Sequence, residues 1–196
     1  MISFQYNKTS LQQLDKQLKV RIRALPTIRN KEAALRSEVK KAKEKTEALN
    51  RNLADTLNSL EDGLRLYNEY RPGLLKIKEV ALSVKKIAGV RTPVLDQVLY
   101  ETEDFSLFNA PAWFPDGIEQ LKKVVAIALE RELYIRKMEL LDQARKKTTQ
   151  KVNLYEKVQI PGFEAAILKI KRFLEDEENL SKSSQKIVKN RRTDTD

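Results

Sequence analysis

The residue types that carry out most enzyme chemistry are missing from this chain. It contains no His and no Cys, which removes nucleophile–base pairs, thiolate catalysis, and zinc sites built on imidazole or thiolate. Its five glycines lie far apart, at positions 63, 73, 89, 117 and 162, so no phosphate-binding loop or dinucleotide fingerprint is present. We therefore predict no catalytic residue, no metal site and no cofactor.

Carboxylates are the remaining candidates for catalysis. The chain has 28 Asp and Glu residues, but they are spread along the polar sides of predicted helices, as in a solvated surface. We predict that the chain is not an enzyme by itself. Without Cys no disulfide can form, which fits a reducing compartment.

Basic residues dominate the charge, and the chain carries a formal net charge of +10 with a pI near 9.6. Such an excess attracts nucleic acid, anionic lipid or acidic protein surfaces, although a basic solvated exterior is the simplest explanation. Lys and Arg alternate with acids over most of the chain, but not after Leu180. The basic residues there, before Asp194, are our candidate partner contacts: Lys182, Lys186, Lys189, Arg191 and Arg192.

A seven-residue repeat runs without a slip from Leu11 to Tyr67, with alternating spacings of three and four. This spacing is typical of a helix supercoiled against a partner, and eight heptads make a rod of roughly 85 Å. The apolar seam residues of this helix are Leu11, Leu18, Leu25, Ile28, Leu35, Val39, Leu49, Leu53 and Leu60. Arg21, Glu32 and Thr46 also fall on the seam, where polar groups weaken packing but set the register.

Four regions follow from the pattern along the chain. The N-terminal coiled-coil helix covers 1–70, with Thr9 or Ser10 as its cap. Pro26 lies within it and should loosen a turn, but the register continues on both sides. A central region covers 71–117, a C-terminal coiled-coil helix 118–190, and a disordered tail 191–196.

The central region has strand character. Val80, Leu82 and Val84 alternate with other residues, and β-favouring residues follow Gly89, so we predict a β-hairpin with its turn near residues 85–89. Residues 105–115 then hold three Phe, two Pro and the only Trp. This segment is either a loop that covers the helix ends or an exposed docking surface.

The C-terminal helix returns to the three–four spacing. Its seam residues are Ile160, Phe163, Ile167, Ile170 and Leu174. Two long helices joined by a small insertion must pair antiparallel, so the predicted fold is mainly α, a long antiparallel two-helix coiled coil with a central β-hairpin. We expect Leu53 beside Ile135, Ile28 beside Ile160, and Leu11 near Glu177, each within a turn or two.

Several segments resemble the D subunit of the V/A-type rotary ATPases. The stretch TTQKVNLYEKVQIP (148–161) is similar to the family's Val-Asn…Glu…Ile-Pro pattern, with Val152, Asn153, Glu156, Ile160 and Pro161 in place. The segments 174–189, 6–35 and 87–95 resemble its C-terminal ending, its basic opening helix and its Gly-Val…Pro strand. The resemblance touches both ends and the middle of the chain.

The resemblance implies a central rotor stalk with no chemistry of its own. It would couple ATP hydrolysis or synthesis in a catalytic ring to ion translocation through a membrane ring. The implied partners are the catalytic and regulatory ring subunits (A and B), the F subunit, and a membrane-proximal funnel subunit. The implied location is cytoplasmic, and membrane-associated only through the complex.

Two alternatives belong to other classes of protein. A basic helical bundle that binds curved membranes would also be positive and elongated, but the strand pattern occupies the place of its third helix. A nucleic-acid-binding coiled coil would bind phosphates through the basic tail, yet the chain shows no base-reading module. No 18-residue apolar run and no signal-peptide pattern is found, so we expect neither membrane insertion nor a leader.

Overall fold

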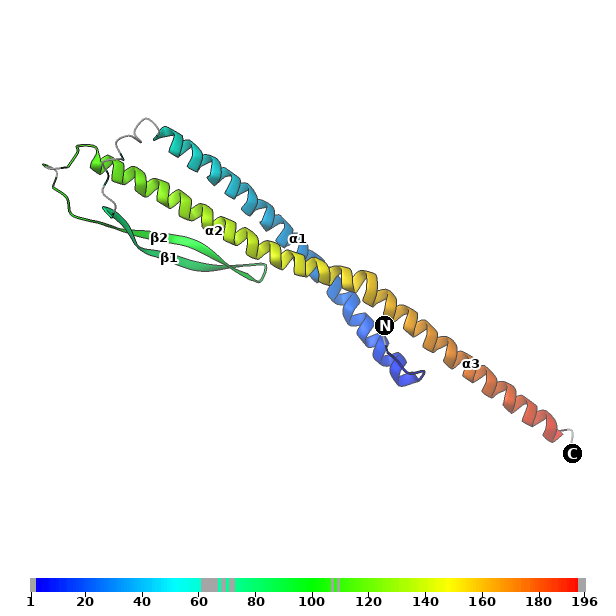
Figure 1. Cartoon of the computed structure of the whole chain (residues 1–196). Helices are drawn as coiled ribbons and strands as arrows, with labels where there is room; N and C mark the ends of the chain where they lie inside the picture. Colours follow the sequence, from blue (N-terminus) through cyan, green and yellow to red (C-terminus); the bar gives the residue numbers. More distant parts are fainter. Residues whose placement is uncertain are drawn as a thin grey trace. The chain divides into compact units, whose positions relative to one another are not determined.

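The computed structural model describes residues 3–60, 67, 70, 73–106, 108 and 110–193, with side chains up to residue 190. Its elements are α1 (Lys8–Ser59), β1 (Leu75–Ile87), β2 (Val90–Thr102), α2 (Phe114–Asn153), the π-helix η3 (Leu154–Gln159) and α3 (Ile160–Thr193) (Figure 1). The described residues are mainly helical, at 74%, which confirms the predicted fold class. It divides into a terminal unit, residues 1–32 with 147–196, and a central unit, residues 33–146.

The first helix is capped by Asn7, and the prediction of Thr9 or Ser10 is wrong. The Ser10 N–H donates to Asn7 Oδ1 at 2.6 Å, and the Gln5 N–H donates to Ser10 Oγ at 3.3 Å. An Asn at this position satisfies one of the backbone donors that the first helical turn leaves unpaired. Ser10 therefore lies in the first turn of the helix and hydrogen-bonds the residues that cap it.

The residues of the seven-residue repeat form the side of α1 that is least exposed to solvent. Leu35, Ala42 and Leu49 are buried, and the other seam residues up to Leu60 are buried or half-buried. The helix continues through Pro26 without a break. It ends at Ser59 and not at residue 70, with a tighter turn in which the Leu60 N–H bonds the Leu57 carbonyl at 3.0 Å. Residues 61–66, 68–69 and 71–72 lie outside the described residues.

The predicted hairpin is confirmed, and its strands are longer than the sequence pattern suggested. β1 and β2 pair antiparallel from Leu75↔Thr102 to Ile87↔Val90, with register shifts between Ile77 and Glu79 and between Ala81 and Leu82. The two-residue turn places Ala88 at φ 48° and Gly89 at φ 85°. Turns with two positive φ angles match the twist of the strands.

The helix after the hairpin begins at Phe114, four residues earlier than expected. Pro115 is tolerated there because the N–H it lacks would have no partner in the first turn. Gly117 is buried and close to the Trp113 ring, which an added Cβ would approach to 2.6 Å. A glycine is therefore required for the ring to pack here.

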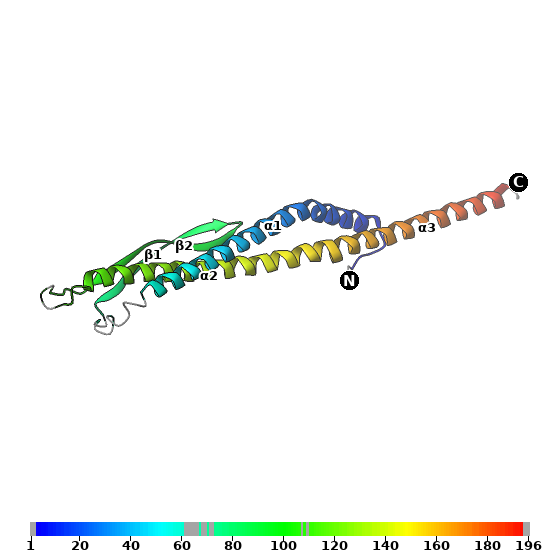
Figure 2. The same ribbon diagram turned by 90° about the horizontal axis from the view of Figure 1, so that it is seen from above.

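Within the central unit, α2 contacts two neighbours. It meets α1 through the ion pair between Lys45 and Glu130 and through the hydrogen bond that Arg131 donates to Asn50. It meets the hairpin through the Tyr100 hydroxyl, which donates to the Lys122 carbonyl at 3.0 Å, and Figures 1 and 2 both draw the hairpin alongside it. Contacts on two sides explain why residues 124–131 of α2 are all half-buried.

Within the terminal unit, α1 and α3 pair antiparallel. Leu14, Phe163, Ala166 and Ile170 form a buried cluster, with further seam residues packed against it: Leu11, Leu18, Ile167 and Leu174. Arg29 pairs with Glu156 at 2.6 Å, so the partner of Ile28 lies about one turn before the expected Ile160. The direction of pairing is confirmed, and this contact lies within the turn or two that the prediction allows.

The π-helix η3 ends at Gln159, two residues before Pro161. The Ile160 N–H bonds the Tyr155 carbonyl, five residues back. Because Pro161 has no N–H and its ring crowds the carbonyl four residues earlier, a wider turn relieves the clash without ending the helix. The single C-terminal helix that the sequence predicts is thus α2, η3 and α3 in sequence.

Helix α3 continues to Thr193, so the expected disordered tail from residue 191 is wrong for its first three residues. Residues 174–193 contain no Gly or Pro to stop the helix, and Lys and Arg near a helix C-terminus interact favourably with its dipole. Residues 194–196 lie outside the described residues.

Candidate functional site

The C-terminal end of α3 is the candidate contact surface predicted from the basic tail. Every residue from 175 to 190 is exposed, and Figure 2 shows α3 continuing past the start of α1 in the terminal unit. Lys182, Lys186 and Lys189 all lie on this exposed length. The side chains of Arg191 and Arg192 lie outside the described residues.

Lys182 has an acidic neighbour one turn earlier on α3. Its Nζ lies 2.7 Å from Glu178 Oε1, and this hydrogen bond holds the pKa of Glu178 below its usual value. Sequence reasoning missed the pair because it considered acids only after Leu180. Leu180 and Ile187 are also exposed here, by 70% and 54%, so the tail presents apolar as well as basic groups.

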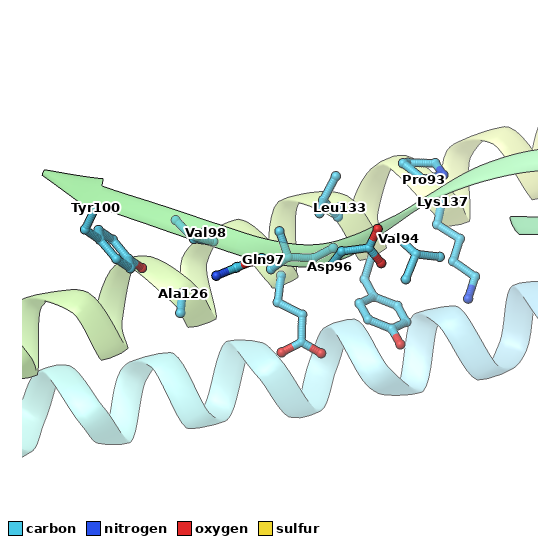
Figure 3. Close-up of a pocket in the computed structure, with 12 residues that line it drawn as sticks. Pro93, Val94, Asp96, Gln97, Val98, Tyr100, Ala126, Leu133 and Lys137 are labelled. Atoms are coloured by element: carbon cyan, nitrogen blue, oxygen red, sulfur yellow. The ribbon is translucent and has the colours of Figure 1, made fainter. Parts of the chain in front are cut away.

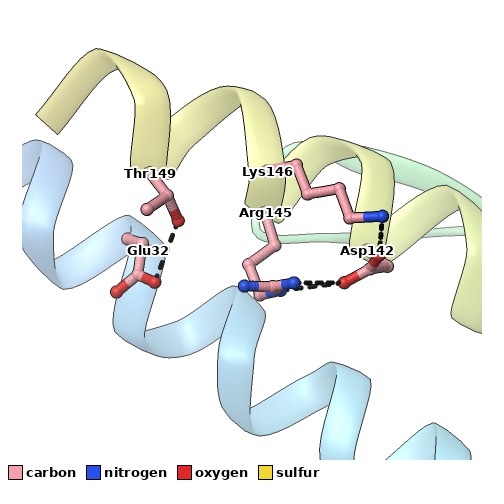
Figure 4. A network of polar contacts seen from close by, with 5 residues as sticks. All are labelled: Glu32, Asp142, Arg145, Lys146 and Thr149. Atoms are coloured by element: carbon pink, nitrogen blue, oxygen red, sulfur yellow. Dashed lines mark hydrogen bonds and ion pairs between the residues drawn. The ribbon is translucent and has the colours of Figure 1, made fainter. Parts of the chain in front are cut away.

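The polar seam residues of the terminal unit each have a partner across the helix pair. Arg21 Nε donates to Gln159 Oε1 at 2.7 Å, and its guanidinium lies 4.4 Å from the centre of the Phe163 ring. The Thr149 hydroxyl donates to Glu32 Oε1 at 3.1 Å (Figure 4). These contacts require one register of the two helices, which is the role predicted for polar seam positions.

A second polar group lies within the central unit on α2. Arg145 donates to Asp142 Oδ1 from Nε at 2.9 Å and from Nη2 at 2.7 Å, and Lys146 lies 3.0 Å from Oδ2 (Figure 4). The Arg145 and Lys146 hydrogen bonds lower the pKa of Asp142. All three residues are on one helix, so these contacts stabilise α2 and do not connect it to another element.

The lowered pKa of Asp142 predicts an acid-dependent loss of stability. The contribution is present above the carboxylate's ordinary pKa of 3.8 and is lost as the pH falls through the lower folded value. Asp142→Asn should therefore cost less than about 1 kcal/mol near neutrality, since the group is near the surface. The cost should shrink towards about pH 3 in thermal melts.

The matched control is Asp55→Asn, because Asp55 is exposed on α1. It should change the melting temperature little at neutral pH. A cost of Asp142→Asn that is as large at acid pH as at neutral pH would contradict the prediction.

Most of the aromatic residues of segment 105–115 pack within the protein. This favours the interpretation of the segment as a covering loop over that of an exposed docking surface. Phe114 is buried with Leu74 and Ile118, and Phe105 and Trp113 pack against them. The rings of Trp113 and Phe114 lie 4.9 Å apart at 74°, an edge-to-face geometry that favours aromatic pairs. Phe108 is the exception, because it is fully exposed.

A groove of about 430 Å³ lies between β2 and α2 in the central unit. Val94 and Val98 line it from the strand, and Ala126 and Leu133 line it from the helix (Figure 3). Tyr134 also lines it from the helix. Tyr100 lies at the same surface, and burial raises the pKa of its phenol. The groove is mostly apolar, so it has the character of a packing surface and offers few groups for chemistry.

Among the described residues, no group of three or more His, Cys, Asp or Glu side chains is placed to hold a metal ion. Over the same part of the chain, none of the helices has the length and apolar character needed to cross a membrane.

Comparison with known proteins decides the family. The sequence model of the ATP synthase D subunit matches residues 10–190. The chain belongs to the ATP synthase D subunit family. The V-type ATP synthase D subunit of Borreliella burgdorferi is 31% identical over 96% of this chain and 95% of its own. The proteins of the same name in Chlamydia muridarum and Chlamydia trachomatis are 28% and 26% identical, each over 84% of both chains.

Membership of this family makes the chain one component of a V/A-type ATPase, and so part of a multi-subunit complex. The resemblance drawn from the sequence is thereby confirmed. Sequence reasoning missed one contact of the terminal unit, in which Tyr6 packs on Phe173 at 4.9 Å between ring centres. The aromatics at positions 4 and 6, just before the helix cap, were the available signal.

Proposed function

We propose that this chain is the central stalk, the rotor shaft, of a V/A-type rotary ATPase. Its turning would couple ATP hydrolysis or synthesis in a ring of A and B subunits to ion translocation through a membrane ring. The F subunit and a membrane-proximal funnel subunit would bind it along its length. The complex would lie on the cytoplasmic face, and this chain would reach the membrane only through its partners.

One observation carries the proposal. In the terminal unit, α1 and α3 form an antiparallel pair with polar contacts that define its register, and residues 175–190 of α3 then continue as an exposed single helix. An axle needs helices that cannot slide past each other, and an end that can enter a ring. The ion pairs Lys40–Glu44, Lys43–Glu47 and Lys182–Glu178 are exposed, and a charged exterior limits adhesion to surrounding subunits.

Rotation can be observed directly because the chain has no Cys. A single cysteine in place of the exposed Lys86 on the hairpin would take a bead, with the complex fixed to a surface through its ring. We expect ATP to drive stepwise rotation of the bead in one direction. As a control, a bead on a ring subunit should stay still. A hairpin that stays still while ATP is hydrolysed would overturn the proposal.

The chain is also proposed to be non-catalytic, so the purified protein should neither bind nor hydrolyse ATP. It offers no His and no glycine-rich loop, and such groups are what usually cradle and cleave a triphosphate. Isothermal calorimetry should detect no ATP binding at millimolar nucleotide, and a phosphate-release assay should stay at the buffer rate. Tight ATP binding by the pure chain would contradict this assignment.

A further inference from the structure

The C-terminal helix carries a second apolar line besides its seam. Its members are exposed and are spaced by four, three, four and three residues: Leu154, Val158, Pro161, Ala165 and Leu168. We call them the outer stripe. Leu154, Val158 and Leu168 are exposed by 44%, 61% and 50%. Apolar side chains in a continuous exposed row mark interaction sites more often than scattered ones do.

The outer stripe is not part of the packed core of the terminal unit. The core is made by the seam residues Phe163 and Ile170 together with Ala166, which are 0–4% exposed and pack against Leu14 of α1. Spacings of three and four keep one row of side chains facing a partner helix. The seam has its partner in α1, and the outer stripe has the same spacing on another side of η3 and α3.

Basic residues border the outer stripe. Lys169 and Arg172 follow Ala165 and Leu168 by four residues, and Lys157 precedes Pro161 by four. Side chains four apart are neighbours on a helix surface. Over the part of the chain that the structure describes, no carboxylate pairs with these three cations. Two acidic residues, Glu156 and Glu164, lie in the same stretch, and Glu156 is already paired with Arg29 of α1. The border is therefore net positive.

We infer that the outer stripe is the docking surface for a helix of another subunit, with an apolar face at three–four spacing and acidic residues along its edges. Such a helix would bury the stripe and place carboxylates beside the unpaired cations. The inference rests on the chain's place in a multi-subunit complex, which its family gives, and does not depend on rotation.

Two other occupants fit less well. A second copy of this chain would bring the same cations to the same border, and like charges oppose that contact. A lipid surface is usually bound by a broad apolar face rich in Trp, Phe and Leu. The outer stripe is one side chain wide and includes Pro161 and Ala165, so it matches a helix better than a membrane.

The test uses the intact complex purified from native cells. A photoreactive phenylalanine analogue replaces Val158 in one variant and Leu168 in another, and mass spectrometry maps the crosslinked peptides. Leu57 is the matched control position, because it is 45% exposed on α1. Crosslinks are read with the complex at rest, so the result is independent of whether the chain turns.

We expect both positions to crosslink to one helical segment of another subunit, with apolar residues three and four apart and Asp or Glu beside them. Yields no higher than at Leu57 would overturn the inference. Crosslinks to lipid, to a second copy of the chain, or to a segment without acidic residues would overturn it too.

A charge variant tests the acidic border separately. Lys157→Glu with Lys169→Glu leaves the apolar stripe intact but replaces two attractions by repulsions. Since rim charge pairs are individually weak, the crosslink yield from Val158 should fall about 2-fold to 30-fold. Lys16→Glu with Lys19→Glu on α1 is the control, and it should not lower the yield. An unchanged yield in the border variant would overturn the acidic character of the partner.

Discussion

Replacing Leu35 by Ala should destabilise the protein by about 2–4 kcal/mol, because a fully buried leucine leaves a cavity when it is shortened. Leu35 is 0% exposed and occupies the seven-residue seam of α1. Urea or thermal unfolding followed by circular dichroism would measure the loss. An effect of this size is a large part of the stability of an ordinary domain.

Leu57→Ala is the matched control on the same helix. Leu57 is 45% exposed and lies off the seam, so its truncation should cost less than about 0.5 kcal/mol. Equal losses in the two variants would show that the seam is not the stabilising side of α1. The burial of a side chain on α1 would then not predict its contribution to the free energy of unfolding.

Deleting residues 181–196 should weaken the coupling of ATP hydrolysis to rotation. The deletion removes the basic tail and leaves the core cluster of Leu14, Phe163 and Ile170 in place. Each rim-type charge contact contributes about 0.2–1 kcal/mol. The five basic residues together should contribute about 1–5 kcal/mol, so the affinity for the ring should fall at least about fivefold.

A variant with Gln at the five basic positions separates charge from length. If charge centres the tail in the ring, this variant should behave like the deletion, while any single Lys→Gln should have little effect. Binding of the F subunit should survive in both, because we place its surface nearer the middle of the chain. If ring affinity and rotation were unchanged in both variants, the basic tail would be a solvated helix end with no role in coupling.

The antiparallel pair and the hairpin were both predictable from local pattern. The spacing from Leu11 to Leu60 fixes which side of α1 faces a partner, because only a three–four alternation keeps one stripe inward. Alternation around Gly89 likewise predicts two strands and a turn. Both signals are short-range, and the structure contains both elements.

The ends of the elements were less predictable. Thr9, Ser10 and Asn7 are all good caps, and the choice of Asn7 follows from the bond that Ser10 accepts from the Gln5 N–H. The start of α2 at Phe114 depends on the packing of Trp113 against Gly117. Contacts of this kind are specific to the folded chain and leave no periodic signal.

The sequence by itself determined the family, the helical class and the absence of His, Cys and glycine-rich chemistry. Only the tertiary structure showed that the C-terminal helix has a second apolar line, and that this line is exposed. Phe163 and Ile170 are buried against α1, while Val158 and Leu168 are exposed. Both lines have the same spacing, and spacing shows only which residues share a face of the helix. Whether that face is buried depends on contacts with residues far away in the chain.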